Sequence, residues 1–246
     1  MNALTDYDRT RYDRQMLIPG WGEQGQLKLE SATVFIAGAG GLGSPVALYL
    51  AVAGVGTICV ADADTVELSN LNRQILHTDA RIGEPKARSA YETLCQTNPT
   101  INVVPYNESL NESNLTRIVG RPDIVVDCLD NFPTRYLLNA YCATHGIPFV
   151  HGAVHGLLGQ VSFISPPETP CLRCVFPEAP PKEKFPVLGA TPGVIGSVQA
   201  MEALKYLTGT GSNLRSALLF FDGTDMTFST ITTSQSPTCP VCADLR

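Results

Sequence analysis

The sequence predicts an α/β fold in which a Rossmann-like parallel half is continued by a mixed or antiparallel half within a single domain. Two observations predict it. Over residues 33–150, short and fully apolar strands alternate with helical segments, which is the pattern of βαβ units around a buried parallel sheet. Beyond residue 150, strand-like segments follow one another with a single long helix between them, so the alternation ends there.

The elements of the first half follow in order from apolar runs and from residues that begin helices. Residues 5–30 are predicted to be helical, with Thr5 as the N-cap and Asp8 three positions later. A strand at 33–37 leads into a helix at about 42–53, whose first turn contains Pro45. The further predicted elements are strands at 57–61, 101–104, 124–127 and 147–150, a helix opened by Pro85 and a helix begun by Pro133.

The second half has a different character. Strands are expected at 160–164, 217–221 and 226–231, and one long helix is expected at about 194–207. Residues 175–190 are rich in Pro, Lys and Glu, so we expect an exposed and mobile loop there.

Composition excludes several classes of protein. A net charge of −6 and a pI near 5.2 argue against a general nucleic-acid binder, which needs a basic face. The longest apolar stretch, 45–61, contains Gly54 and Gly56 and therefore predicts a helix, a turn and a strand, with no membrane span. The N-terminus is polar and acidic, unlike a secretory signal, and thiol-rich chains without disulfides suit a reducing compartment. We therefore expect a cytoplasmic protein.

A glycine-rich loop after the first strand gains its meaning from its context, since the motif alone is weak evidence. Gly38-x-Gly40-x-x-Gly43 follows that strand and opens a helix, and Asp62 ends the next strand. Such glycines allow a tight turn and close approach of a ligand, while the helix N-terminus favours phosphate and the carboxylate can accept from ribose hydroxyls. The sequence therefore predicts a nucleotide site. The alternative is a tight strand-to-helix turn without a ligand.

Charged and amide side chains follow the strands on either side of this loop. Asn70, Arg73, Gln74 and Lys86 come after the second strand, and Asp130-Asn131 follows the fourth. Cationic side chains neutralise polyphosphate and a carboxylate at a strand end can hold Mg²⁺, so the set suits phosphoryl or nucleotidyl transfer better than hydride transfer with NAD. Taken singly, Arg73 and Lys86 could be solvated charges, and Asp130 could be the N-cap of the following helix.

Two Cys-x-x-C pairs, Cys171/Cys174 and Cys239/Cys242, predict a metal site. Four thiolates in two chelating pairs suit a closed tetrahedral zinc site, which leaves no open position for catalysis. We therefore expect a structural Zn²⁺ that fastens the C-terminal segment to the middle of the chain. Two disulfides or unrelated thiols are the alternatives.

Several motifs together resemble the MoeB/ThiF/HesA family, the prokaryotic relatives of ubiquitin-activating enzymes, and look closest to its molybdopterin-synthase adenylyltransferase type. The two Cys-x-x-C pairs and Gly193–Ser197 extend the resemblance to nearly the whole chain. The other motifs, in order, are Arg11-Tyr12-Asp13-Arg14-Gln15, Gly38–Gly43, Asp62-Ala63-Asp64, Ser69-Asn70-Leu71-Asn72-Arg73-Gln74, Gly83-Glu84-Pro85-Lys86 and Asp127-Cys128-Leu129-Asp130-Asn131.

The resemblance implies ATP-dependent adenylation of the C-terminal glycine of a small β-grasp, ubiquitin-like sulfur carrier that ends in Gly-Gly, with release of pyrophosphate. It implies that Asp62 binds the ribose, that Asp130 binds Mg²⁺, and that Arg14 reaches the active site of the other protomer of a homodimer. The catalytic residues would be Arg14, Arg73, Lys86 and Asp130. The nucleotide-binding residues would be Gly38, Gly40, Gly41, Gly43, Asp62, Asp64, Ser69, Asn70, Arg73, Gln74, Lys86, Asp130 and Asn131.

The chain departs from the family pattern in one respect. Many relatives carry a cysteine in the loop before the long helix, but residues 175–190 contain none, and we expect no rhodanese-like extension after Cys242. We therefore expect sulfur to come from a separate donor protein. The other four cysteines, Cys59, Cys95, Cys128 and Cys142, fall in apolar strand or helix patterns and are expected to be buried.

Other functions remain open from the sequence. The chain could adenylate another substrate, a peptide or a tRNA, or it could be a zinc-containing nucleotide-binding adaptor without turnover; a dehydrogenase is a more distant alternative. Molybdopterin, thiamine, tRNA thiolation and other sulfur pathways would all suit a sulfur-carrier enzyme. On the leading hypothesis, the domain consists of N-terminal helices (1–32), a nucleotide-binding half (33–150) and a partner-binding and zinc half (151–246).

Overall fold

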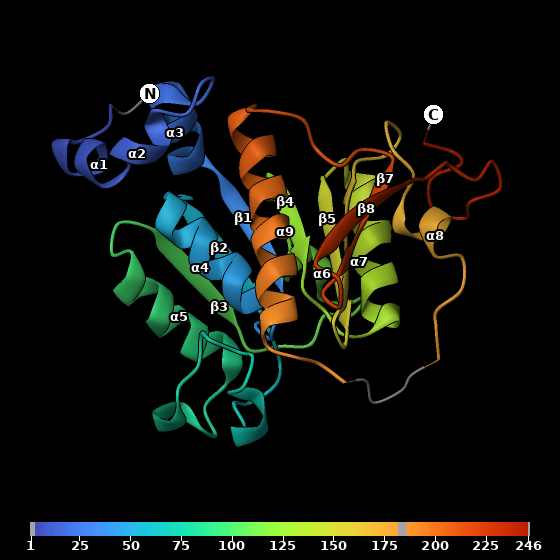
Figure 1. Cartoon of the computed structure of the whole chain (residues 1–246), viewed down its shortest axis with the longest axis horizontal. Coiled ribbons are helices and arrows are strands. Elements are labelled where there is room, and N and C mark those ends of the chain that lie inside the picture. The colour runs from blue at the N-terminus through green and yellow to red at the C-terminus, as the bar shows by residue number, and fades with distance from the viewer. Residues whose placement is uncertain (1–2, 182–185, 246) are drawn as a thin grey trace.

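The computed structural model describes residues 3–181 and 186–245, and their strands form one mixed sheet (Figure 1). Five strands are parallel: β1 (Thr33–Ala37), β2 (Thr57–Ala61), β3 (Asn102–Tyr106), β4 (Ile124–Asp127) and β5 (Phe149–His155). Three strands continue the sheet in antiparallel pairing: β6 (Leu158–Ile164), β7 (Ala217–Asp222) and β8 (Thr227–Thr232). The order is β3-β2-β1-β4-β5-β6-β7-β8. The predicted fold class, a parallel half followed by a mixed half, is therefore confirmed.

Helices cover both faces of this sheet. One core contains residues of α3 (Gly22–Ser31), α4 (Gly43–Ala53), α5 (Lys86–Thr97) and α9 (Ala190–Thr208). The other contains residues of α6 (Leu115–Ile118), α7 (Phe132–His145) and α8 (Leu172–Val175). In β1, Val34 and Ile36 belong to the first core and Phe35 to the second, because successive side chains of a strand point to opposite faces. Burial on both faces explains why this strand is apolar throughout.

The predicted N-terminal helix is not continuous. Thr5 caps its start in a capping box with Asp8, as expected, but the segment divides into α1 (Asp6–Arg11), α2 (Asp13–Met16) and α3. The breaks fall at Tyr12, which is buried, and near Gly20, which adopts a positive φ of 85°. A positive φ cannot be accommodated within a right-handed helix, so the chain turns there.

Other boundaries also differ from the sequence prediction. The helix expected at 194–207 begins four residues earlier, because Pro192 is acceptable in a first helical turn. The strands expected at 101–104 and 147–150 lie at 102–106 and 149–155. Four short pieces were not predicted: α6, α8 and the 3₁₀ turns η1 (Leu68–Asn70) and η2 (Asp79–Arg81), which are too short to show a period.

The loop expected at 175–190 is only partly described. Residues 177–181 are exposed, whereas 182–185 lie outside the described residues, so the expected mobility stays a prediction. Its last part is joined to the β5–β6 turn, where Gly156 N donates to Pro186 O at 2.8 Å. The end of the segment belongs to α9. No helix in the described ranges is long and apolar enough to cross a membrane.

The order of the parallel strands creates a place for a ligand. Strands β1 and β4 are neighbours in the sheet, but the chain leaves them in opposite directions. It passes from β1 to β2 on one side and from β4 to β5 on the other side. In open α/β sheets, ligands bind in the crevice outside the carboxyl ends of the strands at such a switch point. The glycine loop follows β1 and the Asp130 loop follows β4, so both meet there.

Candidate nucleotide site and cysteine cluster

Two glycines of the loop after β1 are required by packing. Gly38 has φ = 101°, and a Cβ there would lie 2.6 Å from Cys128 O. A Cβ on Gly43 would lie 1.9 Å from Gly38 O, so the first turn of α4 can approach the strand only with glycine. Gly40 is different, because its Cβ would meet only Gln74 Nε2, at an ordinary 3.6 Å. Packing within the chain therefore does not explain Gly40, which suits close approach of a ligand.

Asp62 is fastened to the glycine loop. Its Oδ2 accepts from Ala39 N at 2.8 Å, and its Oδ1 accepts from Asp64 N at 2.9 Å. Burial raises the pKa of Asp62, while Lys86 and the two backbone N–H groups act in the opposite direction. The carboxylate thus shapes the loop, and its remaining lone pairs can accept from a ribose.

Lys86 is a nearly buried cation at the start of α5. Its Nζ lies 2.8 Å from Asp64 Oδ2; the Lys86 side chain is 8% exposed and that of Asp64 is 73% exposed. Both belong to a polar cavity of about 350 Å³ outside the carboxyl end of β2. The cavity is lined by Ala63, Asp64, Thr65, Glu67, Asn70 and Lys86. Asp64, Asn70 and Lys86, predicted as site residues, therefore lie together.

Arg73 and Gln74 flank the glycine loop from the segment after η1. A Cβ on Gly41 would lie 3.6 Å from Arg73 Cγ, and Arg73 Nη1 donates to Ser69 O at 2.9 Å. Gln74 is buried beside Gly40, and its Oε1 has no hydrogen-bond partner among the described residues. A buried polar atom without a partner is uncommon and calls for a ligand or water. The residues fit a polar ligand such as a nucleotide.

His77 is a buried residue beside the glycine loop that the sequence did not single out as part of the site. Its Nε2 lies 2.9 Å from Ala39 O, and its Nδ1 lies 2.9 Å from Ser89 Oγ in α5. A carbonyl only accepts, so Nε2 carries the proton and Nδ1 accepts from the serine hydroxyl. Burial lowers the pKa of His77, which favours this neutral form. The imidazole joins the glycine loop, the Arg73 segment and the helix of Lys86.

Asp130 projects from the loop after β4. Its neighbour Asn131 is the N-cap of α7, where Asn131 Oδ1 accepts from Thr134 N at 3.0 Å. The alternative interpretation of Asp130 as that cap is therefore wrong. Asp130 is exposed, two residues beyond Cys128, whose carbonyl packs against Gly38. Its carboxylate thus lies at the switch point, free of a structural role in the helix.

Arg14 is not brought to this site within its own chain. Its neighbour Gln15 donates from Nε2 to Ala53 O at 2.7 Å, at the C-terminal end of α4, whereas the glycine loop precedes the other end. An 11-residue helix is about 16 Å long, which separates the two regions. Figure 1 shows α2 near the end of the sheet where β1 begins, and the segment that leads into α5 near the opposite end.

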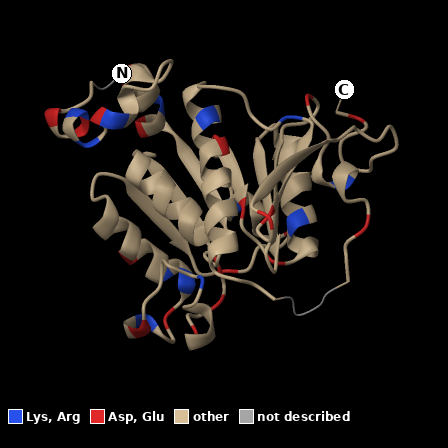
Figure 2. Ribbon diagram, viewed as in Figure 1, with Lys and Arg blue, Asp and Glu red and all other residues tan. Residues whose placement is uncertain are grey.

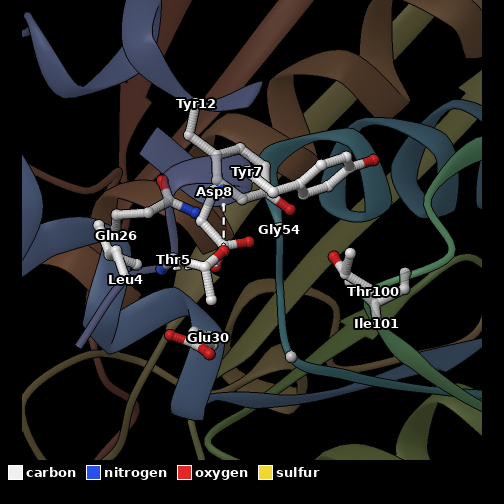
Figure 3. A pocket seen from close by; sticks show the side chains of 11 residues that line it. Leu4, Thr5, Tyr7, Asp8, Tyr12, Gln26, Glu30, Gly54, Thr100 and Ile101 are labelled. Carbon is white, nitrogen blue, oxygen red and sulfur yellow. Dashed lines mark hydrogen bonds between the residues drawn. The ribbon is translucent and has the colours of Figure 1, made fainter. Parts of the chain in front are cut away.

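A second cavity lies near the N-terminal helices, and none of the predicted site residues lines it. Its volume is about 360 Å³, and Tyr7, Asp8, Tyr12 and Glu30 are among its lining residues (Figure 3). Asp8 is engaged in the capping box, and Tyr12 Oη accepts from Asn98 Nδ2 at 2.9 Å. These contacts account for Asp8 and Tyr12 as parts of the fold.

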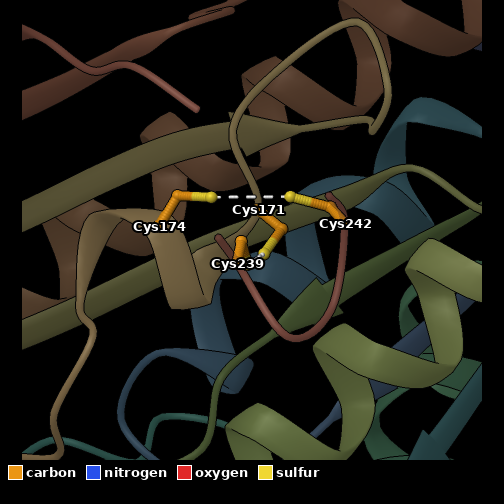
Figure 4. A group of neighbouring side chains, drawn as sticks. All are labelled: Cys171, Cys174, Cys239 and Cys242. Atoms are coloured by element: carbon orange, nitrogen blue, oxygen red, sulfur yellow. Dashed lines mark hydrogen bonds between the residues drawn. The ribbon is translucent and has the colours of Figure 1, made fainter. Parts of the chain in front are cut away.

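The four cysteines of the two pairs come together in space. All four Sγ atoms lie within 4.8 Å of one another, with Cys171–Cys239 at 3.5 Å and Cys174–Cys242 at 3.4 Å (Figure 4). A disulfide needs about 2.05 Å between sulfurs, so the alternative of two disulfides does not hold. Tetrahedral Zn–S bonds of about 2.3 Å place the sulfurs about 3.8 Å apart. The cluster therefore fits a zinc ion.

Donors around the cluster suit thiolates. Ser236 N donates to Cys174 Sγ at 3.4 Å, and Gln235 Nε2 donates to Cys242 Sγ at 3.3 Å. Burial raises the pKa of Cys174 to about 11. For Cys239, burial is outweighed by backbone donors and by neighbouring thiols, which lower its pKa to about 7. One thiolate is thus favoured even before a cation binds.

The remaining cysteines are partly as expected. Cys128 and Cys142 are buried, but Cys59 and Cys95 are only half-buried, because their strand and helix lie near the edge of the sheet. Burial raises the pKa values of Cys59, Cys128 and Cys142. Raised pKa values make thiols poor nucleophiles.

Sequence comparison finds close relatives over nearly the whole chain. The chain is 46% identical over 240 residues to the SAMP-activating enzyme E1 of Haloferax volcanii, covering 95% of this chain and 88% of that protein. It is 43% identical over 251 residues to the sulfur carrier protein adenylyltransferase of Thermus thermophilus, covering 98% and 93%. It is also 43% identical over 236 residues to the adenylyltransferase and sulfurtransferase MOCS3 of Xenopus laevis, but spans only 52% of that protein.

Solved structures share the fold. Escherichia coli MccB superposes with a TM-score of 0.86 at 24% identity, covering 96% of this chain and 75% of that chain. The microcin C7 biosynthetic enzyme MccB in complex with N-formylated MccA gives 0.87 at 23% identity, covering 98% and 77%. Comparison with protein families shows that the ThiF family pattern matches residues 12–241. This range includes the glycine loop, the Asp130 loop and three of the four clustered cysteines. The chain belongs to the ThiF family.

Proposed function

We propose that this chain is an adenylyltransferase that activates the C-terminal glycine of a small, ubiquitin-like β-grasp sulfur carrier at the expense of ATP. The names of its relatives from Haloferax and Thermus support a carrier as the substrate. The observation that carries the proposal is the switch point, where the glycine loop and the loop of the exposed Asp130 carboxylate follow the neighbouring strands β1 and β4. Arg73 flanks the glycine loop, and Lys86 lines the polar cavity after β2. This arrangement suits attack on a phosphate better than hydride transfer.

The reaction requires charge to be stabilised at the α-phosphorus. A carboxylate oxygen of the carrier attacks that phosphorus, the bond to the β-phosphate oxygen breaks, and pyrophosphate leaves with the electron pair. Lys86 and Arg73 would bind the phosphates, and the backbone N–H groups of the glycine loop would face them. Lys86 would then exchange Asp64 for a phosphate oxygen, so that the positive charge of its buried ammonium is paired with a negative charge both before and after ATP binds. Asp62 would accept from the ribose hydroxyls.

Asp130 is the residue proposed to hold Mg²⁺. Its carboxylate is exposed at the carboxyl end of β4, and hard oxygen ligands of this kind suit that ion. When bound with ATP, Mg²⁺ neutralises phosphate charge. Ser69 and Asn131 would complete the polar surroundings, since Ser69 is exposed within η1 and Asn131 adjoins Asp130.

We propose a homodimer in which Arg14 completes the partner's site. Arg14 is exposed and lies far from the site of its own chain. Helix α4 carries no charged residue, as Figure 2 shows, and its Tyr49 and Val52 are 53% and 42% exposed. Met201 of the neighbouring α9 is 61% exposed. Large exposed apolar side chains on adjacent helices are typical of a surface that another protein covers.

We also propose that sulfur transfer depends on a separate donor protein. The thiols outside the cluster are buried or half-buried, and the pKa values of Cys59, Cys128 and Cys142 are raised. The acyl-adenylate would therefore stay non-covalently bound. Intact-mass measurement of the reaction mixture without reductant should show no adduct of enzyme plus carrier.

The decisive experiment is ATP–pyrophosphate exchange with and without a carrier that ends in Gly-Gly. Exchange should require the carrier and Mg²⁺, and should fall about 10²–10³-fold in Arg73→Ala and Asp130→Ala, since each loses a contact to developing charge. Full exchange in both variants would remove these residues from the mechanism. Exchange without any carrier would point to another substrate.

The same assay tests the dimer. Inactive Arg14→Ala and inactive Asp130→Ala chains should regain activity when they are mixed and allowed to exchange subunits, because one of the two sites in a mixed dimer then carries neither defect. If subunit exchange is confirmed and activity stays absent, Arg14 does not act across an interface.

A further inference from the structure

Three buried polar side chains lie directly behind the loop that carries Asp130. Asp127 ends β4, His151 is its partner in the β4–β5 register, and Arg135 lies in the first turn of α7. Asp127 and His151 are fully buried, and Arg135 is 4% exposed. Burying an ion pair is costly, and apolar residues of similar volume often stabilise a fold as well or better. Stability alone therefore does not explain this cluster.

The contacts of the cluster converge on Leu129. Asp127 Oδ1 accepts from Leu129 N at 3.1 Å, and Arg135 Nη2 donates to Leu129 O. The same Arg135 Nη2 donates to Gly152 O at 2.8 Å, which joins the loop to β5. The pair of Asp127 and Arg135 thus holds both polar backbone groups of the residue that immediately precedes Asp130.

His151 holds the Asp127 carboxylate in the orientation that allows Asp127 Oδ1 to accept from Leu129 N. Its Nδ1 donates to Asp127 Oδ2 at 2.8 Å, and Arg135 Nε lies 3.3 Å from the same oxygen without the alignment of a hydrogen bond. Because a carboxylate only accepts, the His151 proton resides on Nδ1. Asp127 Oδ2 is therefore occupied by His151, and Asp127 Oδ1 remains for the hydrogen bond from Leu129 N.

The chain on both sides of Asp130 is fixed as well. Cys128 N donates to Ala37 O of β1 at 2.9 Å, and Asn131 caps α7. Between these anchors only the Asp130 side chain is exposed toward the switch point. The loop is thus built to present one carboxylate with its backbone held on either side.

We propose that Asp127, Arg135 and His151 are positioning residues that preorganise the Asp130 carboxylate for the reacting phosphates. This inference rests on the proposed role of Asp130 in adenylation. Preorganised groups accelerate a reaction only when they are accurately placed, and a displacement of about 1 Å can reduce the rate about 10²-fold. None of the three positioning residues needs to touch the nucleotide.

The test uses full-length variants that keep the buried charge compensated. Arg135→Lys retains a cation for Asp127 but has one nitrogen, which cannot occupy the places of both Nε and Nη2. His151→Leu removes the donor to Asp127, whereas His151→Asn places an amide donor near the position of Nδ1. Glu202→Gln is the matched control, because Glu202 is an equally buried carboxylate that accepts from Leu214 N at 2.7 Å, away from the Asp130 loop.

The first readout is amide hydrogen exchange at Leu129 in the protein without ligands. Exchange should be about tenfold faster in Arg135→Lys and in His151→Leu, as expected for a weakened hydrogen bond, and close to wild type in His151→Asn and Glu202→Gln. Unchanged exchange at Leu129 in folded Arg135→Lys and His151→Leu would overturn the proposal. Equal acceleration in Glu202→Gln would overturn it too, since the effect would then be global loosening.

The second readout is the exchange reaction with a carrier. kcat should fall about 10²-fold in Arg135→Lys and His151→Leu, with KM for ATP changed less than about threefold, and His151→Asn should restore most of kcat. A rise in KM at constant kcat would contradict a positioning role. If the wild type itself shows no carrier-dependent exchange, the proposed function fails, and hydrogen exchange at Leu129 still decides whether the cluster holds the loop.

Discussion

Several side chains of the candidate nucleotide site have partners within the chain. Lys86 is paired with Asp64, Arg73 donates to the backbone of its own turn, and Asp62 accepts from Ala39. A buried ammonium without a partner would be strongly unfavourable, so this pairing allows Lys86 to be buried at all. A phosphate that bound to Lys86, as we propose, would have to compete with Asp64 for the ammonium.

At the scale of single residues, two buried imidazoles should make the fold sensitive to acid. Burial lowers the pKa of His77 and of His151 below the value near 6.5 of an unfolded chain. The unfolded state therefore binds more protons as the pH falls through about 6.5, so the free energy of unfolding decreases from pH 7.5 to 5.5, by up to about 1.4 kcal/mol for each imidazole. Urea unfolding at both pH values measures the decrease.

The variant His77→Gln should make that decrease smaller, because one titrating group is removed. A decrease of the same size in His77→Gln would mean that other groups cause the acid sensitivity.

At the scale of elements, the loop between β1 and α4 combines two kinds of glycine. Gly38 and Gly43 let the strand, the helix and the Cys128 backbone approach one another, whereas Gly40 borders only Gln74. The first kind serves the fold, and we propose that the second allows a ligand to approach. One glycine-rich motif therefore contains separable roles.

Alanine substitutions should separate these roles. Gly43→Ala should lower the free energy of unfolding by about 2 kcal/mol or more, because its methyl group would overlap Gly38 O. Gly40→Ala should change it by less than about 1 kcal/mol, yet weaken ATP binding at least about tenfold, since the methyl group occupies space that a phosphate needs. Denaturant unfolding and calorimetric titration with ATP check the two effects; unchanged affinity in Gly40→Ala would contradict a ligand-facing loop.

At the scale of the whole molecule, the cysteine cluster fastens the C-terminal segment beside α8. It joins residues 68 positions apart, and Phe176, just beyond α8, accepts a hydrogen bond from Tyr136 Oη of α7 at 2.8 Å. Closing such a long loop reduces the entropy of the unfolded chain. The nucleotide site lies at the carboxyl ends of β1 and β4 and shares no residue with the cluster.

Removal of metal should therefore affect stability before it affects nucleotide binding. We expect about one zinc ion per chain by metal analysis, held by the four clustered cysteines. Chelation should lower Tm while the Kd for ATP stays constant, because no cluster residue borders the glycine loop. Cys95→Ser, which changes a thiol outside the cluster, should leave zinc content unchanged. Loss of ATP affinity at an unchanged Tm would contradict a structural role.

Much of the fold and of the site could be predicted from the sequence, because the signals are local. Apolar runs bounded by glycine and proline predicted the strands, and the spacing within each Cys-x-x-C pair predicted a cluster that the structure confirms as a possible zinc site. The motif order predicted the family, which is also confirmed. Lys86, Asp64 and Asn70 were predicted together and share one cavity. In each case, neighbours in the chain carry the information.

Only the tertiary structure decided the roles of residues whose partners are distant in the chain. His151 meets Asp127 because β4 and β5 pair in that register, and His77 meets Ala39 because α5 and the glycine loop enclose the same segment. Arg14 was predicted to act in the site of a partner protomer, and that role stays a prediction; the structure shows only that α2 holds it at the end of the sheet away from the glycine loop of its own chain. Composition and the periodicity of apolar residues indicate which side chains are buried. Strand register and helix placement decide which buried groups meet, and both depend on the packing of the whole sheet.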